Sequence, residues 1–149
     1  MQGLEDLYRE IILDHYKSPR NRGELETPPA VKAVGFNPLC GDEIIVYLQT
    51  ETGDDGVERV VDVAIGGQGC AISQASASLM SGAAKGKSLD ELDDLVHTVK
   101  AQFGIDSAED RGADLGDIEA LSGVGRFPER IKCATLAWNT MTEATEQLD

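Results

Sequence analysis

The sequence predicts an α+β domain in which helices pack on a small antiparallel sheet of three strands. Apolar residues recur at helical spacing near both ends of the chain, and three strand-like runs lie between them. A short turn rich in Gly and Asp joins the second and third runs, which indicates that these two strands are antiparallel neighbours. The order of elements predicts a single domain over residues 1–149, with about five to six helices around the sheet.

The first helix is predicted near the start of the chain, where side chains on one helix face recur every three or four residues. These side chains are Leu4, Leu7, Tyr8, Ile11, Ile12 and His15. The pair Ser18-Pro19 ends this helix, because the residue before a proline disfavours helical backbone angles. His15 lies on the apolar face, so we interpret it as a packed histidine rather than a ligand.

The three strands are predicted at residues 31–37, 43–50 and 57–65, and the second is the richest in β-branched and aromatic side chains. Residues 52–56 have the composition of a hairpin turn. The run Gly66-Gly67-Gln68-Gly69 is predicted as a glycine loop that opens the next helix. This run lacks the lysine and the spacing of a phosphate-binding loop, which argues against nucleotide binding.

Helices are predicted to follow the sheet. Residues 71–84 are rich in Ala and Ser, so this helix can approach the sheet closely. The sequence Ser88-Leu89-Asp90-Glu91 is a capping-box signature, after which helical spacing continues to Phe103. The acidic residues between 90 and 94 are interpreted as a solvated helix face, and His97 as a solvated histidine.

The region before the last helix is less regular. Residues 104–116 are rich in Gly and Asp and show no periodicity, which predicts a loop. Asp117 is predicted to cap a short helix at 118–121, and Pro128 suits the first position of the last helix.

Charge and hydropathy exclude several classes of function. Asp and Glu number 27 against 13 Lys and Arg, which gives a formal net charge of −14. Such a chain repels the phosphates of nucleic acids and disfavours anionic membranes, so neither is expected as a partner. No apolar run reaches the length of a membrane span, and the N-terminus does not resemble a secretory signal. We therefore expect a cytoplasmic protein.

The three cysteines carry the chemical interest of the sequence. An odd number of cysteines in a chain expected to be cytoplasmic argues against disulfides and favours metal binding or thiol chemistry. Cys40 lies in a tight turn before a strand, Cys70 at the start of a helix, and Cys133 in the first turns of the last helix. Cysteines at loops and helix starts are expected to be partly exposed, and a helix N-terminus favours the thiolate.

Three thiolates and the carboxylate of Asp42 make a possible set of four ligands. Zinc accepts such tetrahedral sulfur and oxygen donors, and iron–sulfur clusters also use thiolates. The spacing of the cysteines matches neither a zinc finger nor a thioredoxin motif. On spacing alone, each cysteine is more simply explained as a small buried apolar residue.

The sequence contexts of the cysteines are more specific than their spacing. Through them the chain resembles the NifU-like/IscU-like iron–sulfur cluster assembly family over nearly its whole length. The matching motifs are Leu7-Tyr8, His15-Tyr16, Pro19-Arg20-Asn21, Asn37-Pro38-Leu39-Cys40-Gly41-Asp42, Gly67-Gln68-Gly69-Cys70-Ala71-Ile72-Ser73 and Arg130-Ile131-Lys132-Cys133.

Within this family the chain is similar to the SufU branch rather than to the scaffold branch. Scaffolds have a histidine directly before the third cysteine, where this chain has Lys132. The stretch between Cys70 and Cys133 is also longer than in scaffolds, consistent with an insertion around residues 104–123. The sequence Phe127-Pro128-Glu129-Arg130 replaces the Pro-Pro-Val-Lys segment by which chaperones recognise scaffolds.

The resemblance implies the IscU/NifU N-terminal fold and a zinc-dependent sulfurtransferase that turns over only with a partner. Zn²⁺ would be held by Cys40, Asp42, Cys70 and Cys133. Cys40 would accept persulfide sulfur from a PLP-dependent, SufS-like cysteine desulfurase by ligand exchange, in which a desulfurase histidine replaces it on the metal. Arg130 would contact the desulfurase, and a scaffold complex containing SufB would receive the sulfur.

Two alternatives remain open at this stage. The first is an IscU-like scaffold that binds iron or a [2Fe–2S] cluster through the same ligands, against which Lys132 and the insertion count. The second is an α+β interaction domain with a structural zinc ion, against which an aspartate ligand and the glycine-rich loops count.

Overall fold

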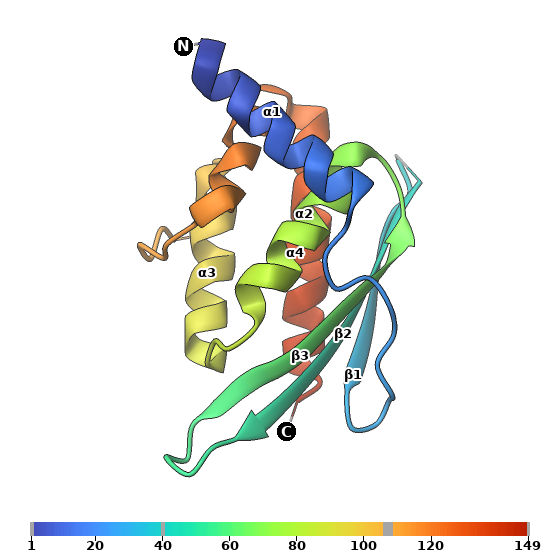
Figure 1. Ribbon diagram of the computed structural model, residues 1–149, viewed down its shortest axis with the longest axis vertical. Helices are drawn as coiled ribbons and strands as arrows, with labels where there is room; N and C mark the ends of the chain where they lie inside the picture. Colours follow the sequence, from blue (N-terminus) through green and yellow to red (C-terminus); the bar gives the residue numbers. More distant parts are fainter. Residues whose placement is uncertain (1, 40, 106–108, 149) are drawn as a thin grey trace.

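The structure is a computed structural model that describes residues 2–39, 41–105 and 109–148. These residues form three strands and five helices, one of which is a 3-10 helix (Figure 1). In chain order the elements are α1 (Gln2–Lys17), β1 (Val31–Asn37), β2 (Asp42–Thr52), β3 (Glu58–Gln68), α2 (Ala71–Ala84), α3 (Leu89–Gln102), η1 (Gly116–Arg126) and α4 (Pro128–Glu146). The prediction of an α+β fold with a three-stranded antiparallel sheet is confirmed.

The sheet has the strand order β1-β2-β3, and both pairs of neighbours are antiparallel. The β1–β2 register runs from Val31 opposite Leu48 to Asn37 opposite Asp42. The last residue of β1 and the first of β2 are therefore a directly opposed pair. In an antiparallel pair, opposed side chains leave the same face of the sheet, so Asn37 and Asp42 lie next to each other.

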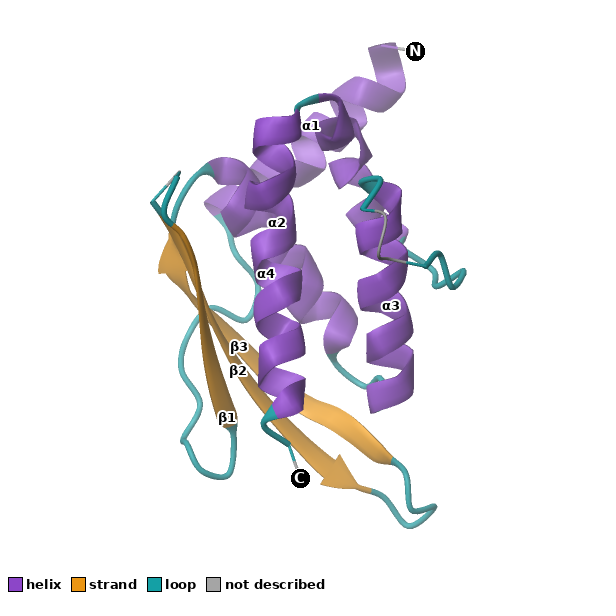
Figure 2. Ribbon diagram, turned by 180° about the vertical axis from the view of Figure 1, so that it is seen from behind, coloured by secondary structure: helices purple, strands orange, loops and turns teal. Residues whose placement is uncertain are grey.

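The helices cover one face of the sheet, where α4 packs on β1 and β2, and α2 packs on β3 (Figures 1 and 2). Small residues let α2 and α4 approach each other closely. The side chain of Ser76 lies between them, because its hydroxyl donates to the Ala134 carbonyl at 2.6 Å and accepts from Trp138 Nε1 at 3.0 Å. Trp138 is fully buried, so this pairing satisfies its only polar atom inside the core.

The first helix is tied to α2 by its predicted packed histidine. His15 Nδ1 lies 2.7 Å from Ser78 Oγ, which also accepts the backbone N–H of Arg20 at 2.8 Å. The segment that follows α1 then joins the free edge of β3. There Asn21 and Gly23 exchange backbone hydrogen bonds with Ile65, each at 3.0 Å.

Two local predictions are corrected. The glycine run is not a loop, since Gly66, Gly67 and Gln68 continue β3 and pair with β2. At Gly67 a Cβ atom would lie 2.0 Å from the Glu43 carbonyl oxygen, so glycine permits the strands to approach here. Asp117 does not cap a helix, because it lies within η1, which begins at Gly116 with no side-chain cap.

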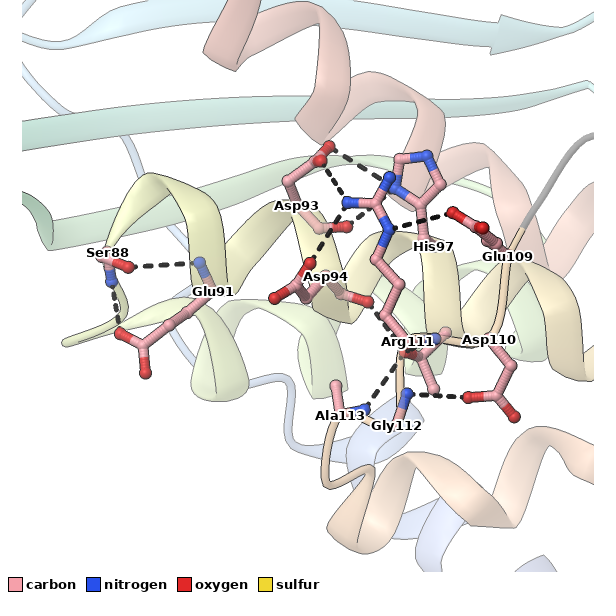
Figure 3. Close-up of polar contacts among 11 residues, drawn as sticks. Ser88, Glu91, Asp93, Asp94, His97, Glu109, Asp110, Arg111, Gly112 and Ala113 are labelled. Carbon is pink, nitrogen blue, oxygen red and sulfur yellow. Dashed lines mark hydrogen bonds and ion pairs between the residues drawn. The ribbon is translucent and has the colours of Figure 1, made fainter.

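The predicted capping box of α3 is confirmed: Ser88 Oγ accepts the Glu91 N–H, and Glu91 Oε1 accepts the Ser88 N–H. Two further acidic residues of this helix, Asp93 and Asp94, bind the segment that follows it (Figure 3). Arg111 Nη1 lies 2.7 Å from Asp93 Oδ2 and 3.1 Å from Asp94 Oδ1. The acidic run is therefore more than a solvated face, because it anchors residues 109–113 to α3.

His97 is half-buried rather than fully solvated, and its Nδ1 lies 2.9 Å from the Asp93 carbonyl oxygen. In the described ranges 2–39, 41–105 and 109–148, no helix is both long and apolar enough to cross a membrane.

Candidate metal centre

Three of the predicted ligands converge at one end of the sheet. One ligand atom each of Asp42, Cys70 and Cys133 lies within 4.8 Å of the other two. Asp42 is the first residue of β2, Cys70 is the N-cap of α2, and Cys133 lies in the second turn of α4. Residues from three separate elements thus place two sulfur atoms and one oxygen atom around a common point.

The Asp42 side chain is completely buried. Its Oδ1 accepts the backbone N–H of Cys70 at 2.9 Å, whereas its Oδ2 has no hydrogen-bond partner within residues 2–39, 41–105 and 109–148. A buried carboxylate oxygen without a partner is costly, since burial removes the water that would otherwise solvate it. A cation held between this oxygen and the two cysteine sulfur atoms would compensate that cost.

Gly69 makes room for this arrangement. A Cβ atom at this position would lie 2.3 Å from Asp42 Oδ1 and 2.7 Å from Ser73 Oγ. Any larger residue would therefore displace the carboxylate or the start of α2. The glycine lets the chain turn from β3 into α2 while the Cys70 N–H remains in contact with Asp42.

The two described cysteines differ in exposure. Cys70 is half-buried at the N-terminus of α2, as expected for a helix start, and no side chain caps this helix. Cys133 is only 2% exposed, so the expectation that it is partly exposed is wrong. The second turn of α4 faces the interior, and the Cys133 sulfur lies 4.0 Å from the Glu129 carbonyl oxygen.

The donor set fits a zinc ion. Zinc accepts thiolate sulfur and carboxylate oxygen, and its structural sites are tetrahedral, so a fourth ligand is required. The predicted fourth ligand, Cys40, lies outside the described residues. Its neighbour Gly41 has a φ of +70°, which glycine adopts without strain. The Gly41 N–H donates to the Asn37 carbonyl at 2.9 Å, which closes the turn before β2.

Arg130 is exposed and lines a groove of about 920 Å³ beside the metal centre. Arg130 precedes Cys133 by one helical turn, and Ile72, which also lines the groove, lies two residues beyond Cys70. Apolar side chains from α1, η1 and the start of α4 supply most of the remaining lining. The groove therefore offers, at the starts of α2 and α4, an apolar surface with arginines.

Sequence reasoning missed one residue of this site. Asn37 is 7% exposed and lies opposite Asp42, and its Nδ2 is a buried donor that finds no acceptor in the described part of the chain. An asparagine before a proline and a cysteine is typical of a turn. Only the strand register shows that its side chain adjoins the ligands.

A family model described as the NifU-like N terminal domain matches residues 7–144. The zinc-dependent sulfurtransferase SufU of Bacillus subtilis is 44% identical over 138 residues, which cover 93% of this chain and 88% of that protein. The iron–sulfur cluster assembly scaffold protein IscU of Streptococcus pyogenes is 38% identical over 144 residues, which cover 97% of this chain and 86% of that protein.

Solved structures agree with these sequence relatives. An iron–sulfur cluster assembly scaffold protein for the SUF system (FiSufU) from Fervidobacterium islandicum superposes with a TM-score of 0.75 and 31% identity, and the match covers 90% of this chain and 93% of that one. A NifU-like protein from Brucella abortus superposes with a TM-score of 0.76 and 28% identity, covering 96% and 94% of the two chains.

Proposed function

The chain belongs to the family of NifU-like N-terminal domains, which serves iron–sulfur cluster assembly, and on this premise we propose that it is a zinc-dependent sulfur carrier. The observation that supports the proposal most strongly is the convergence of Asp42, Cys70 and Cys133 within 4.8 Å, with Asp42 Oδ2 buried and unpartnered. The B. subtilis relative described as a zinc-dependent sulfurtransferase supports zinc as the metal.

In this proposal Asp42, Cys70, Cys133 and Cys40 hold the ion. Zinc supplies a positive charge that keeps its cysteine ligands deprotonated at neutral pH. Asp42 is oriented by the Cys70 N–H before any metal binds, so the oxygen ligand is already in place. Cys133 is held by the buried face of α4, so the sulfur ligand from this helix has a fixed place.

The reaction is a thiol–disulfide type exchange at Cys40. The bound metal would keep Cys40 deprotonated and a ligand of the desulfurase would free it, so that the Cys40 thiolate could attack the terminal sulfur of the desulfurase persulfide. A bond forms between the Cys40 sulfur and the transferred sulfur, while the sulfur–sulfur bond of the donor breaks. The desulfurase cysteine leaves as a thiolate with the electron pair of that bond, so no external oxidant or reductant is needed.

The partner in this proposal is a PLP-dependent cysteine desulfurase of the SufS type. Arg130 and the groove beside it are the surface that we assign to this partner, because Arg130 is exposed and one helical turn from Cys133. The sulfur then passes to a scaffold complex containing SufB.

One observation favours a second function, that of a scaffold for a [2Fe–2S] cluster. The S. pyogenes relative, 38% identical, is described as a scaffold. Thiolates are also the usual ligands of iron–sulfur clusters. The position before Cys133 is occupied by Lys132, which is exposed and adds no ligand that a cluster would need.

Metal content and kinetics separate the two functions. We expect the purified chain to hold about one zinc per chain, and to raise the rate at which a SufS-type desulfurase converts cysteine to alanine. The Cys40→Ala variant should lose this stimulation. Iron with acid-labile sulfide in place of zinc would favour the scaffold, and full stimulation by Cys40→Ala would refute the transfer mechanism.

Variants of two exposed arginines test whether Arg130 contributes to the docking surface. Arg130→Ala should raise the concentration needed for half-maximal stimulation of the desulfurase while the zinc content stays unchanged. Arg111→Ala, which removes an exposed arginine bound to α3, serves as the matched control and should stimulate like the original protein. Equal behaviour of the two variants would exclude Arg130 from the docking surface.

A further inference from the structure

Of the two polar atoms in the Asn37 side chain, only Oδ1 has a hydrogen-bond partner among the described residues. Its Oδ1 accepts the backbone N–H of Leu39 at 3.2 Å, which is an Asx turn that shapes the segment leading to β2. Its Nδ2 is buried and has no hydrogen-bond partner among the described residues. A buried amide donor without an acceptor costs free energy, so its presence here requires an explanation.

The strand register places this donor at the metal centre. Asn37 is directly opposite Asp42, and opposed side chains on an antiparallel pair leave the same face of the sheet. Both side chains are at least nine-tenths buried and each holds one unpartnered polar atom, Nδ2 on Asn37 and Oδ2 on Asp42. No hydrogen bond joins these two atoms in the described part of the chain, so each requires another partner.

We propose that Asn37 is a positioning residue of the metal centre, whose Nδ2 donates a hydrogen bond to a sulfur ligand when the metal is bound. This inference rests on the proposed metal site. Asp42 Oδ1 already accepts the Cys70 N–H, and Oδ2 is the oxygen that would bind the metal. The cysteine sulfur atoms are therefore the remaining acceptors of the ligand set.

A hydrogen-bond donor at this place would offset the negative charge of the metal centre. Three thiolates and one carboxylate around Zn²⁺ would carry more negative charge than the ion neutralises, and two of the ligands, Asp42 and Cys133, are buried. Hydrogen bonds from outer groups orient metal ligands and reduce the charge on sulfur. Because Asn37 also holds the turn through Oδ1, the same side chain couples the shape of this turn to the state of the sulfur ligands.

Two variants separate the donor from the turn. Asn37→Ser retains a short oxygen that can accept the Leu39 N–H, as serine does in comparable turns. Its hydroxyl ends one bond short of the position of Nδ2, so it does not replace the amide donor there. Asn37→Ala removes both groups. Each variant and the original protein are loaded with Co²⁺ in place of Zn²⁺, because the absorption band for charge transfer from sulfur to cobalt reports the charge on the thiolates. Metal affinity is measured by competition with a chelator.

We expect both variants to bind metal about 10–100-fold more weakly, the range seen when an outer partner of a metal ligand is removed. We also expect the charge-transfer band to move to longer wavelength in both, because a sulfur atom that loses a hydrogen bond gives up its electrons more readily. Thermal unfolding of the metal-free Ser variant checks that its fold is intact. An unmoved band overturns the inference, whether or not affinity falls, because Asn37 would then act through the turn alone.

This test also distinguishes the inference from the proposed function. If the original protein binds neither cobalt nor zinc, the metal centre itself is refuted, and this is visible before any variant is made. If the original protein binds cobalt with a sulfur charge-transfer band and the variants reproduce that band, the metal centre stands and only the role of Asn37 is refuted.

Discussion

Two polar regions of this molecule differ in whether their polar atoms have partners within the described residues. On α3, Arg111 binds Asp93 and Asp94, and Thr98 Oγ1 accepts the backbone N–H groups of Arg111 and Ala113, each at 3.2 Å (Figure 3). At the metal centre, Asn37 Nδ2 and Asp42 Oδ2 are buried and have no partner among the residues that the structure describes. The first region is exposed and complete without a ligand, whereas the second is buried and incomplete.

The difference shows how a binding site can be recognised in a structure without ligands. Exposed ion pairs contribute little, because water solvates their charges almost as well as the partner does. Buried polar atoms without partners raise the free energy of the fold unless something binds them. We therefore expect changes at the metal centre to alter ligand binding strongly, and changes on α3 to alter only local order.

The largest effect is expected for Asp42→Asn. This change keeps the Oδ1 acceptor for the Cys70 N–H but removes the negative charge that faces the metal. Zinc affinity should fall more than about 100-fold, since outer partners alone are worth 10–100-fold. Asp93→Asn, which removes an exposed carboxylate on α3, is the control and should leave zinc affinity unchanged in a chelator competition. Equal losses in the two variants would contradict the comparison.

The next largest effect is expected for Gly69→Ala, which places a Cβ atom against Asp42 and Ser73. Overpacking of this kind should lower the free energy of unfolding by about 1–3 kcal/mol in chemical denaturation. Gly82→Ala is the control, because a Cβ at this exposed position of α2 meets nothing within 4 Å. It should raise stability by about 0.5–1 kcal/mol, as alanine favours the helix over glycine. A stable Gly69→Ala variant that still binds zinc normally would show that the centre is less crowded than described.

A smaller effect is expected from pH at His15, a partnered group outside both regions. Partial burial lowers the pKa of His15 below its ordinary value of 6.5, and the positive charge of Arg20 lowers that pKa further, while Asp14 and Asp117 oppose the shift. Since the pKa is lower in the folded state than in the unfolded state, its stabilising contribution is present above pH 6.5 and is lost as pH falls through the folded pKa. His15→Asn can still accept a hydrogen bond from the Ser78 hydroxyl but does not titrate in this range. It should therefore reduce the loss of stability below pH 6.5, as measured by thermal unfolding at a series of pH values. An unchanged profile would assign the pH dependence to other groups.

The smallest effect is expected for Arg111→Ala. Loss of the contacts with Asp93 and Asp94 should increase amide hydrogen exchange at Gly112 and Ala113, while the unfolding midpoint and zinc affinity stay close to those of the original protein. Arg111→Lys should show an intermediate increase, because lysine keeps the charge but cannot contact two carboxylates with one planar group. Reduced zinc binding in Arg111→Ala would mean that the two regions are coupled.

Local patterns predicted most of the fold. The first strand is found at residues 31–37, the helix 71–84 has the predicted bounds, and the capping box at Ser88 and Pro128 at the start of α4 are present as expected. These features depend on neighbours within a few residues, so the sequence alone can reveal them. The glycine-rich residues 66–68 were mistaken for a loop because their strand conformation depends on pairing with β2, which is remote in sequence.

The sequence predicted which residue types supply the ligands of the site, but not how deeply they are buried or which residues lie beside them. The motifs around Cys40, Cys70 and Cys133 pointed to thiolate ligands, and Asp42 to the oxygen ligand. The burial of Cys133 was missed, since helical position alone does not decide which face of α4 contacts the sheet. Asn37 was missed for the same kind of reason, as its place beside Asp42 depends on the register between β1 and β2.

The sequence by itself determined which donor atoms this protein has, the turn or helix end that carries each one, and a net charge of −14. Only the tertiary structure decided that Asp42, Cys70 and Cys133 meet within 4.8 Å and that two of them are buried. The physical reason is the separation along the chain of the residues that interact. Capping and turns arise from contacts between near neighbours, whereas the packing of α2 and α4 on the sheet joins residues that are distant in the chain. This packing also removes the water around polar atoms, which a bound metal ion would then satisfy.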